Sequence, residues 1–319
     1  MNYSKILEEL FLKQEEYLGN NKHVNNIIPT VSVHVITYQH VNYIEDCLKG
    51  ILMQKTNFPI EIVIGEDESE DGTREICKKY AEEYPNKIRL FLRDRNKSVL
   101  KENGQTTYFN GKLTLKTCRG KYIALCEGDD YWTDPLKLQK QVDFLEKNPD
   151  CSLCFHASKS IRNNNPENYS IHKPKKLPAD NKFEMKHAIL GGGGFMATNS
   201  MLFFKEYIEE RPEWMNEAPV GDLPLMLLLA SKGKIGYIDD VMSVYRVMSS
   251  ASAWSASMQN RARRKKHHCA ILKMWTGFDN WTGKKYHRFV VRKKMKNKWN
   301  YYKWQIKHLQ LRIFKNIKL

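Results

Sequence analysis

The sequence has no long apolar run. Its uninterrupted hydrophobic stretches are far shorter than the about 18 residues that a membrane-spanning helix requires. The first segment, Met1 to Gly19, is acidic and carries apolar residues at helical spacing, unlike the leader of a secreted protein. We therefore expect neither a membrane-spanning helix nor a secretory signal. The 319 residues are enough for one large domain with an appendage.

Cysteines are few and form no evident disulfide set. There are seven, an odd number, and they are scattered along the sequence, which is typical of a reducing compartment. Cys151 and Cys154 form a Cys-x-x-Cys pair, but neither a second pair nor a histidine lies at zinc spacing. We interpret this pair as part of a strand that faces the core. These features favour a cytoplasmic protein.

Acidic residues are almost missing from the last fifth of the chain. From Arg261 to Leu319 there are 19 lysines and arginines and one acid, Asp279, a net charge of +18, whereas the first 260 residues carry 33 basic and 35 acidic side chains. The same segment also holds Trp275, Trp281, Trp299, Tyr301, Tyr302 and Trp304. A basic helical face with aromatic residues suits an anionic membrane surface, on which the protein would be peripheral, or nucleic acid. The alternative is a helical tail that packs its aromatics on the rest of the chain and leaves its lysines in solvent.

Acid is instead concentrated where one apolar run ends. The stretch from Tyr122 to Trp132 is apolar up to Cys126 and continues with Glu127, Asp129 and Asp130 around a glycine. Such a run reads as a buried strand, so the carboxylates should project at its carboxyl end, the edge at which open α/β sheets bind ligands. Hard divalent ions bind there through one or two carboxylates together with phosphate oxygens. An Asp-Asp pair alone is more often a solvated turn, so the surrounding pattern has to decide.

The pattern upstream predicts a mostly parallel α/β sheet. Apolar, β-branched runs alternate with helical patterns, as in βαβ units. The expected strands are 31–37, 60–65, 88–92, 121–126 and 151–157, and the expected helices are 41–54, 72–84, 107–118, 135–147 and 223–231. The segment 161–182 reads as a loop or weak hairpin. The glycine-rich stretch from Gly191 to Phe195 lacks a following Lys-Ser or Lys-Thr, so we expect a mobile loop beside an acceptor rather than a phosphate cradle.

Four of these elements, taken together, resemble the inverting family 2 glycosyltransferases of the GT-A fold, a Rossmann-like fold that binds nucleotide sugars. Val31 to Gln39 resembles the first strand of that family, and Glu66 to Thr73 resembles its Asp-Asp-x-Ser-x-Asp-x-Thr signature with Glu in first position. Glu127 to Asp130 resembles its Asp-x-Asp metal motif, again with Glu first, and Gly221-Asp222 resembles the acidic motif on the acceptor side. Their order and spacing cover roughly residues 31–247.

The resemblance implies roles for individual residues on the donor side. Asp67 would accept a hydrogen bond from the ring N–H of uracil, in a pocket lined by the backbone of Ile36, Thr37 and Tyr38. Asp129 and Asp130 would hold Mg²⁺ or Mn²⁺ and the ribose, with Glu127 assisting, and the sequence does not divide these tasks between them. The bland interpretation of Asp67 is a turn or capping acid, which is the role we expect for Asp71.

The resemblance also implies roles on the acceptor side and downstream. Asp222 would be the general base of an inverting transfer, although it could equally cap the helix 223–231. Arg246 follows Tyr245 in what resembles a Tyr-Arg-x-His signature, and could pair with diphosphate or with a structural acid. Met248 stands where that signature has histidine, and His267 or His268 could replace it if the tail folds back. Trp254 and Phe195 are candidates for an acceptor contact or lid.

The prediction is therefore a glycosyltransferase that moves a sugar from a UDP-sugar, with inversion, to a saccharide or lipid-linked saccharide in cell-surface polysaccharide synthesis. The expected domains are an N-terminal helix and lead-in (1–30), a GT-A domain (31–250) and a basic helical extension (251–319). Three alternatives stay open: a nucleotidyltransferase, a nucleic-acid-binding protein that acts through its basic tail, and an inactive family member.

Overall fold

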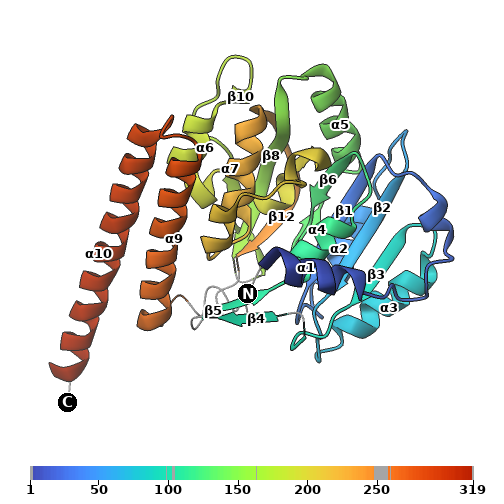
Figure 1. Cartoon of the computed structure of the whole chain (residues 1–319), viewed down its shortest axis with the longest axis horizontal. Coiled ribbons are helices and arrows are strands. Elements are labelled where there is room, and N and C mark those ends of the chain that lie inside the picture. The colour runs from blue at the N-terminus through green and yellow to red at the C-terminus, as the bar shows by residue number, and fades with distance from the viewer. Residues whose placement is uncertain are drawn as a thin grey trace.

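A computed structural model describes residues 3–97, 99–102, 105–162, 164–247, 258 and 260–317 (Figure 1). The helices are α1 (Tyr3–Leu12), α2 (Ile44–Leu52), α3 (Thr73–Glu83), α4 (Asn110–Thr117), α5 (Lys137–Lys147), α6 (Met185–Gly191), α7 (Asp222–Lys232), α9 (Arg261–Trp281) and α10 (His287–Ile317), with short 3-10 turns between them. The strands are β1 (Val31–Thr37), β2 (Ile60–Glu66), β3 (Ile88–Leu92), β4 (Val99–Glu102), β5 (Gln105–Tyr108), β6 (Tyr122–Leu125), β7 (Tyr131–Trp132), β8 (Cys151–Arg162), β9 (Asn165–His172), β10 (Lys182–Phe183), β11 (Leu202–Phe204) and β12 (Lys234–Val247).

The main sheet is mostly parallel, as the sequence predicts. Its strand order is β10-β12-β8-β11-β6-β1-β2-β3. Strands β1, β2, β3 and β6 pair in parallel, as do β8 and β12, whereas β11 runs antiparallel to both β6 and β8. Because β11 alone is reversed between the two parallel groups, β1, β2, β6, β8 and β12 all end at the same edge of the sheet.

Two apolar cores lie on the two faces of this sheet. One core packs α2, α3 and α5 against β1, β2 and β6 through residues such as Ile44, Leu48 and Leu138. The other packs α4, α6, α7 and α9 against the opposite face. The strands are nearly continuous apolar runs because both faces are covered, which is typical of parallel sheets in α/β proteins. Because helices cover both faces of the sheet, polar groups gather at the edge where the parallel strands end.

Most expected boundaries agree with the structure to within three residues. The strand expected at 151–157 instead continues to Arg162 as β8. Strands β11 and β12 are not among those expected, and two expected loops contain strands. The loop expected after β3 contains the two-stranded hairpin β4–β5, and the segment 161–182 contains β9, which pairs antiparallel with β8. The helix expected from residue 135 begins at Lys137, because Asp134 accepts a hydrogen bond from the backbone N–H of Leu136 at 2.8 Å before the helix starts. The glycine-rich segment forms the end of α6 and a short 3-10 turn.

The basic C-terminal segment folds into two long helices at one end of the molecule (Figure 1). Trp275 and Phe278 of α9 and Val290 of α10 are buried in the second core, so this part packs on the main body as one of the sequence alternatives proposed. Trp299 and Tyr302, farther along α10, are instead exposed. Among the described residues, no helix is both long and apolar enough to cross a membrane.

Candidate active site

The edge where β1 and β6 end carries an acidic loop that is fixed to β1. The backbone N–H of Cys126 donates to the carbonyl of His34 at 3.1 Å, and that of Gly128 donates to the carbonyl of Ile36 at 2.9 Å. A Cβ atom at Gly128 would lie 2.6 Å from Thr37 Oγ1. The loop therefore needs glycine at this position to approach β1, and this contact fixes the direction of the acids on either side of it.

Glu127, Asp129 and Asp130 form one carboxylate cluster. One carboxylate oxygen from each lies within 4.8 Å of the others. Asp130 is fully buried, its Oδ1 accepts the backbone N–H of Arg246 at 2.8 Å, and its Oδ2 has no hydrogen-bond partner among the described residues. Burial raises the pKa of Asp130 well above its usual range, and burial together with Asp129 and Asp222 raises the pKa of Glu127 to about 8.

This set of donors fits a hard divalent cation. Carboxylate oxygens are the ligands that Mg²⁺ and Mn²⁺ prefer. Like charges so close together disfavour ionisation of one another, and a cation would reverse that effect. The buried Oδ2 of Asp130 is an orphaned acceptor, and Asp129 and Glu127 are more exposed than Asp130, so an ion entering from solvent would meet them first.

Asp222 lies near this cluster and comes from a different element, α7. It is the first residue of α7, Gly221 precedes it as the N-cap without a side-chain bond, and the Asp222 side chain is close enough to Glu127 to raise the pKa of that residue. Burial raises the pKa of Asp222 itself, against the lowering effect of backbone N–H groups at the start of the helix. Its Oδ2 lies 4.0 Å from where a Cβ of Gly193 would be. Asp222 is thus a fixed carboxylate at a helix start, with the glycine-rich segment next to it.

Tyr245, which the sequence analysis quoted without giving it a role, also faces the acidic cluster. Its pKa is raised by burial first, and then by Asp130, Glu127, Asp129 and Asp222. The Tyr245 side chain is therefore near these carboxyls. The pairing of β7 with β12, which sets Tyr131 opposite Val244, brings this part of β12 next to the acidic loop. The sequence signal for Tyr245 is its place in what resembles a Tyr-Arg-x-His signature.

Arg246 links the acidic loop to α2 through hydrogen bonds and an ion pair. Its guanidinium is almost fully buried, pairs with Asp46 of α2 at 2.5 Å, and donates to the carbonyl of Asp129 at 2.9 Å and to Asn164 Oδ1 at 3.1 Å. It also lies 4.4 Å from the ring centroid of Tyr131. Of the two roles left open by the sequence, these contacts match the structural ion pair, because its donors are already engaged by the protein.

A second group of residues lies together at the ends of β1, β2 and β3. The backbone N–H of Asp67 donates to the carbonyl of Thr37 at 3.1 Å, so Asp67 is fixed next to Thr37 and Tyr38. Its Oδ2 pairs with Arg95, whose guanidinium lies 3.8 Å from the ring centroid of Tyr38. Its Oδ1 is buried and has no hydrogen-bond partner among the described residues. Burial, opposed by Arg95, raises the pKa of Asp67 to about 6.

Two residues near Asp67, Arg95 and Asp71, bear on the roles expected from the sequence. Arg95 was not a sequence candidate, although it follows the third parallel strand at the same edge as the acidic motifs. Asp71 accepts hydrogen bonds from the backbone N–H groups of Val41 and Thr73, both at 3.0 Å, which is the local structural role expected for it. Among the described residues Asp67 accepts no such capping bond, and its Oδ1 is left without a hydrogen-bond partner.

The remaining candidates lie elsewhere or outside the described residues. The ring of Phe195 packs against Phe155 and Phe183, with centroids 5.4 and 5.3 Å away, and so anchors the glycine-rich segment to the core. His268 stacks on Tyr301 of α10 at 4.2 Å, within the C-terminal helix pair. Met248 and Trp254 lie outside the described residues. His267 lies next to His268, and burial lowers its pKa to about 4.

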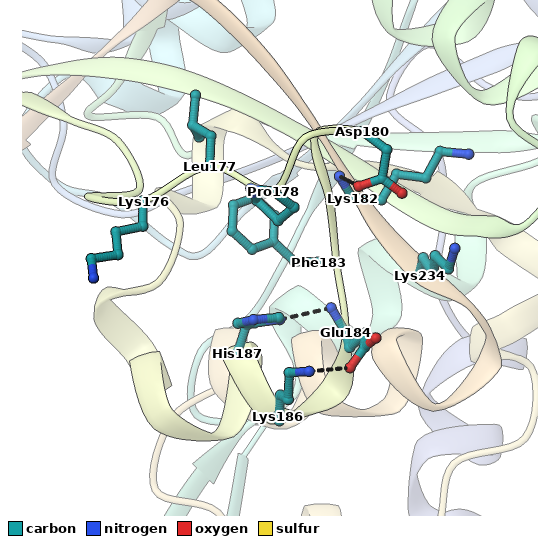
Figure 2. Close-up of a pocket in the computed structure, with 10 residues that line it drawn as sticks. All are labelled: Lys176, Leu177, Pro178, Asp180, Lys182, Phe183, Glu184, Lys186, His187 and Lys234. Carbon is teal, nitrogen blue, oxygen red and sulfur yellow. Dashed lines mark hydrogen bonds and ion pairs between the residues drawn. The ribbon is translucent and has the colours of Figure 1, made fainter.

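A pocket of about 480 Å³ lies far from this edge, at the start of β12 (Figure 2). Its lining residues are Lys176, Leu177, Pro178, Asp180, Lys182, Phe183, Glu184, Lys186, His187 and Lys234. Two of its lysines, Lys182 and Lys234, pair with Asp150 at 2.7 and 3.2 Å, and Lys186 pairs with Glu184 at 2.7 Å. Because Lys234 and Arg246 lie near opposite ends of β12, this pocket is separate from the acidic cluster.

The chain is similar to known proteins over about two thirds of its length. Residues 32–211 match the family described as "Glycosyl transferase family 2". The chain is 34% identical to the uncharacterized protein Mb1547 of Mycobacterium bovis over 68% of this chain, and it spans 58% of that relative's length. It is 28% identical to TuaG of Bacillus subtilis, a putative teichuronic acid biosynthesis glycosyltransferase, over 73% of this chain and 86% of TuaG.

The structural comparison concerns the fold. A crystal structure of S. aureus TarS superimposes with a TM-score of 0.52 at 17% identity, covering 79% of this chain and 40% of TarS. The structure of TarS residues 1–349 with UDP-GlcNAc gives 0.50 at 13% identity, covering 84% of this chain and 89% of that one. The expected GT-A architecture is therefore confirmed. These findings give no support to the nucleotidyltransferase alternative.

Proposed function

The chain belongs to glycosyl transferase family 2, and on that premise we propose that it transfers a sugar from a UDP-sugar, with inversion, to a saccharide or lipid-linked saccharide acceptor. The observation that carries the proposal is the clustering of Glu127, Asp129 and Asp130 at the edge where the parallel strands end, with Asp222 close enough to raise the pKa of Glu127. Asp67, with its unpaired oxygen, lies at the same edge at the end of β2. We infer that the GT unit spans residues 31–250 and that the basic extension begins after it.

Uracil is the base whose hydrogen-bonding groups match Asp67 and Arg95. Its ring N–H is a donor between two carbonyl acceptors, and the unpaired Oδ1 of Asp67 supplies an acceptor for it, while Arg95 is a cationic donor beside the same carboxylate. The Tyr38 ring adds an apolar surface next to Arg95. A protonated Asp67 would lose this match, because its carboxyl would then present an O–H donor.

Asp222 is the general base in this proposal. An inverting transfer forms a bond from the acceptor oxygen to the anomeric carbon as the bond to the nucleoside diphosphate breaks, and the acceptor proton passes to a carboxylate on the acceptor side. The diphosphate leaves with the bonding electron pair. Burial raises the pKa of Asp222, which makes its carboxylate a stronger base than an exposed one. Its position at the first residue of α7 fixes its direction.

The acidic cluster would hold a divalent cation in the same site. Asp129 and Asp130, with Glu127 beside them, would be its ligands, and a bound Mg²⁺ or Mn²⁺ supplies charge that stabilises the leaving diphosphate. Arg246 positions this cluster through the carbonyl of Asp129 and the side chain of Asp130. Tyr245 is a partly buried phenol near these carboxyls. It is also a donor that can bond a carboxylate or a sugar hydroxyl.

The class of acceptor is proposed from the named function of a similar protein. TuaG is named for teichuronic acid biosynthesis, and we infer a role for this chain in cell-surface polysaccharide synthesis. Polysaccharide precursors are often carried on lipids at a membrane, and the basic segment from Arg261 would bring the enzyme to an anionic membrane surface where such an acceptor lies. The identity of the transferred sugar depends on the loops around the site.

The experiment is a thermal-shift and transfer panel. UDP-glucose, UDP-GlcNAc, GDP-mannose and UDP are added with and without Mn²⁺, since a ligand that binds only the native state raises the apparent melting temperature. We expect shifts with the UDP compounds alone, and larger ones with Mn²⁺. UDP release is then measured for Asp222→Asn and for Asp143→Asn, which changes an exposed acid of α5. A shift with GDP-mannose only, or unchanged turnover in Asp222→Asn, would contradict the assignment.

A further inference from the structure

The outer face of α10 carries a stripe of apolar side chains in solvent. We define this apolar stripe as Met295, Trp299, Tyr302 and Ile306, which are 64%, 60%, 55% and 56% exposed. The spacings of four, three and four residues place them on one face of an α-helix. Single exposed apolar residues need no explanation, but four in a row along one helix face are an interaction surface.

The fold does not need this stripe, because α10 packs through its opposite face. There, Val290 enters the core, the ring of Tyr301 stacks on His268 of α9, and the Arg264 guanidinium lies 4.4 Å from the Trp304 ring centroid. Figure 1 shows α10 as the outermost element on its side of the molecule, with α9 between it and the body, and its C-terminal part extends past α9. The apolar stripe is therefore directed away from the body.

Positive charge borders the apolar stripe. Lys296, Lys303 and Lys307 each follow a stripe residue directly, so they lie along one border of it, and all three are exposed. The one acid from residue 261 onward, Asp279, is buried at the other end of the helix pair, where His287 bonds it at 2.7 Å. The surface is thus apolar along its centre and cationic along its border.

These features select one class of partner. A second copy of the chain, docked stripe to stripe, would set one segment of +18 against another of +18. Single-stranded nucleic acid stacks its bases on aromatic rings, whereas Met295 and Ile306 offer no ring. An anionic bilayer matches both the apolar centre and the cationic border of this surface. Aliphatic and aromatic side chains enter the boundary between headgroups and acyl chains, while lysines contact lipid phosphates.

We propose that α10 lies along an anionic membrane surface, with Met295, Trp299, Tyr302 and Ile306 inserted below the headgroups and the bordering lysines on lipid phosphates. This inference names the face that carries out the membrane part of the proposed function. It does not depend on the transfer chemistry, because neither the apolar stripe nor its lysines belong to the acidic site. Attachment of this kind is reversible and depends on the lipid composition.

The test is flotation of the full chain with vesicles. Vesicles of phosphatidylcholine alone are compared with vesicles that also contain phosphatidylglycerol. We expect binding to the anionic vesicles and little to the neutral ones. Trp299→Ala with Ile306→Ala should lower the partition coefficient by at least about tenfold, since both lose buried apolar area. The matched control, Tyr169→Ala with Ile171→Ala, removes two exposed apolar residues from β9 and should leave partitioning unchanged.

Each outcome decides the proposal. Circular dichroism and the melting temperature show that the stripe variant is folded, and Trp299→Phe, which keeps an apolar ring, should restore most of the binding of Trp299→Ala. Equal partitioning of the stripe and control variants would overturn the proposal. So would a stripe variant that only converts a dimer to a monomer by light scattering, or that loses RNA binding with no change on vesicles.

Discussion

Below about pH 6, the affinity of this protein for a UDP-sugar should fall as Asp67 becomes protonated. Burial raises the pKa of Asp67 to about 6 in the ligand-free protein, with Arg95 acting in the opposite direction. The ionised carboxylate accepts the uracil N–H, whereas the protonated one does not, so affinity is full above this pKa and is lost as the pH falls through it. For one such group, Kd at pH 5 should be about tenfold higher than at pH 7.5.

The stability of the free protein should change in the opposite sense. Because the folded pKa is raised above the usual value of 3.8, protonation of Asp67 favours the folded state. Its contribution to the free energy of unfolding is therefore least favourable above pH 6 and improves as the pH falls from about 6 towards 4. Asp67→Asn should be at least as stable as the parent at pH 7.5 and should bind the donor more weakly.

The measurement is isothermal titration of a UDP-sugar between pH 5 and 7.5. A UDP-sugar is needed because the terminal phosphate of UDP itself titrates near about pH 6. The difference between parent and Asp67→Asn isolates Asp67 from other ionisable groups, such as His40, whose pKa is lowered by burial against the effects of Asp129 and Asp71. Asp143→Asn serves as the control. An equal pH dependence of Kd in the parent and in Asp67→Asn would refute the reasoning.

Three further changes test other parts of the site. Asp222→Asn should lower the transfer rate by about 10²–10⁴ with little change in donor Kd, measured by UDP release, and an equal loss in Asp180→Asn would argue against a specific role. Arg246→Ala should lower the free energy of unfolding by about 2–4 kcal/mol in urea, because several charge-assisted hydrogen bonds are lost; a smaller effect than that of exposed Arg288→Ala would contradict its structural role. Gly128→Ala should weaken Mn²⁺ binding and transfer together by at least about tenfold, whereas unchanged binding would show that the loop can shift.

The sequence predicted the sheet and its acidic edge because both follow from local patterns. Strands that are continuous β-branched, apolar runs must be covered by helices on both faces of the sheet. Parallel strands then bring their carboxyl ends to one edge. This reasoning placed Asp67, Asp129 and Asp130 at the ends of β2 and β6, where the structure has them. It placed Asp222 at a helix start for the same reason, since Gly-Asp before an apolar run is a helix signal.

The parts that the sequence could not predict depend on distant contacts or on weak local signals. Arg246 is fixed by Asp46, 200 residues earlier, and no local pattern distinguishes that ion pair from a contact with diphosphate. Arg95 acquires a role only because β2 and β3 are neighbours, which brings it onto Asp67 and Tyr38. The two strands of the hairpin β4–β5, Val-Leu-Lys-Glu and Gln-Thr-Thr-Tyr, show no alternation of apolar and polar residues.

The distribution of charge leads to a last prediction. Buried carboxyls with raised pKa values need a counter-charge, and the protein has a large excess of cations, yet Lys296, Lys303 and Lys307 of α10 are exposed to solvent. The buried Lys293 of the same helix donates to the carbonyls of Leu190 and Gly191 at 3.1 and 2.9 Å. These lysines are therefore not paired with the carboxylate cluster, and a bound metal ion would supply its counter-charge. Replacing Lys296 and Lys303 by Gln should leave the Kd for a UDP-sugar with Mn²⁺ within about twofold, because exposed charges beyond a Debye length are screened. The same variant should lower partitioning into anionic vesicles. If the affinity for the UDP-sugar fell along with vesicle partitioning, the lysines of α10 and the acidic cluster would act as one site. The inferred separation of these two regions would then be wrong.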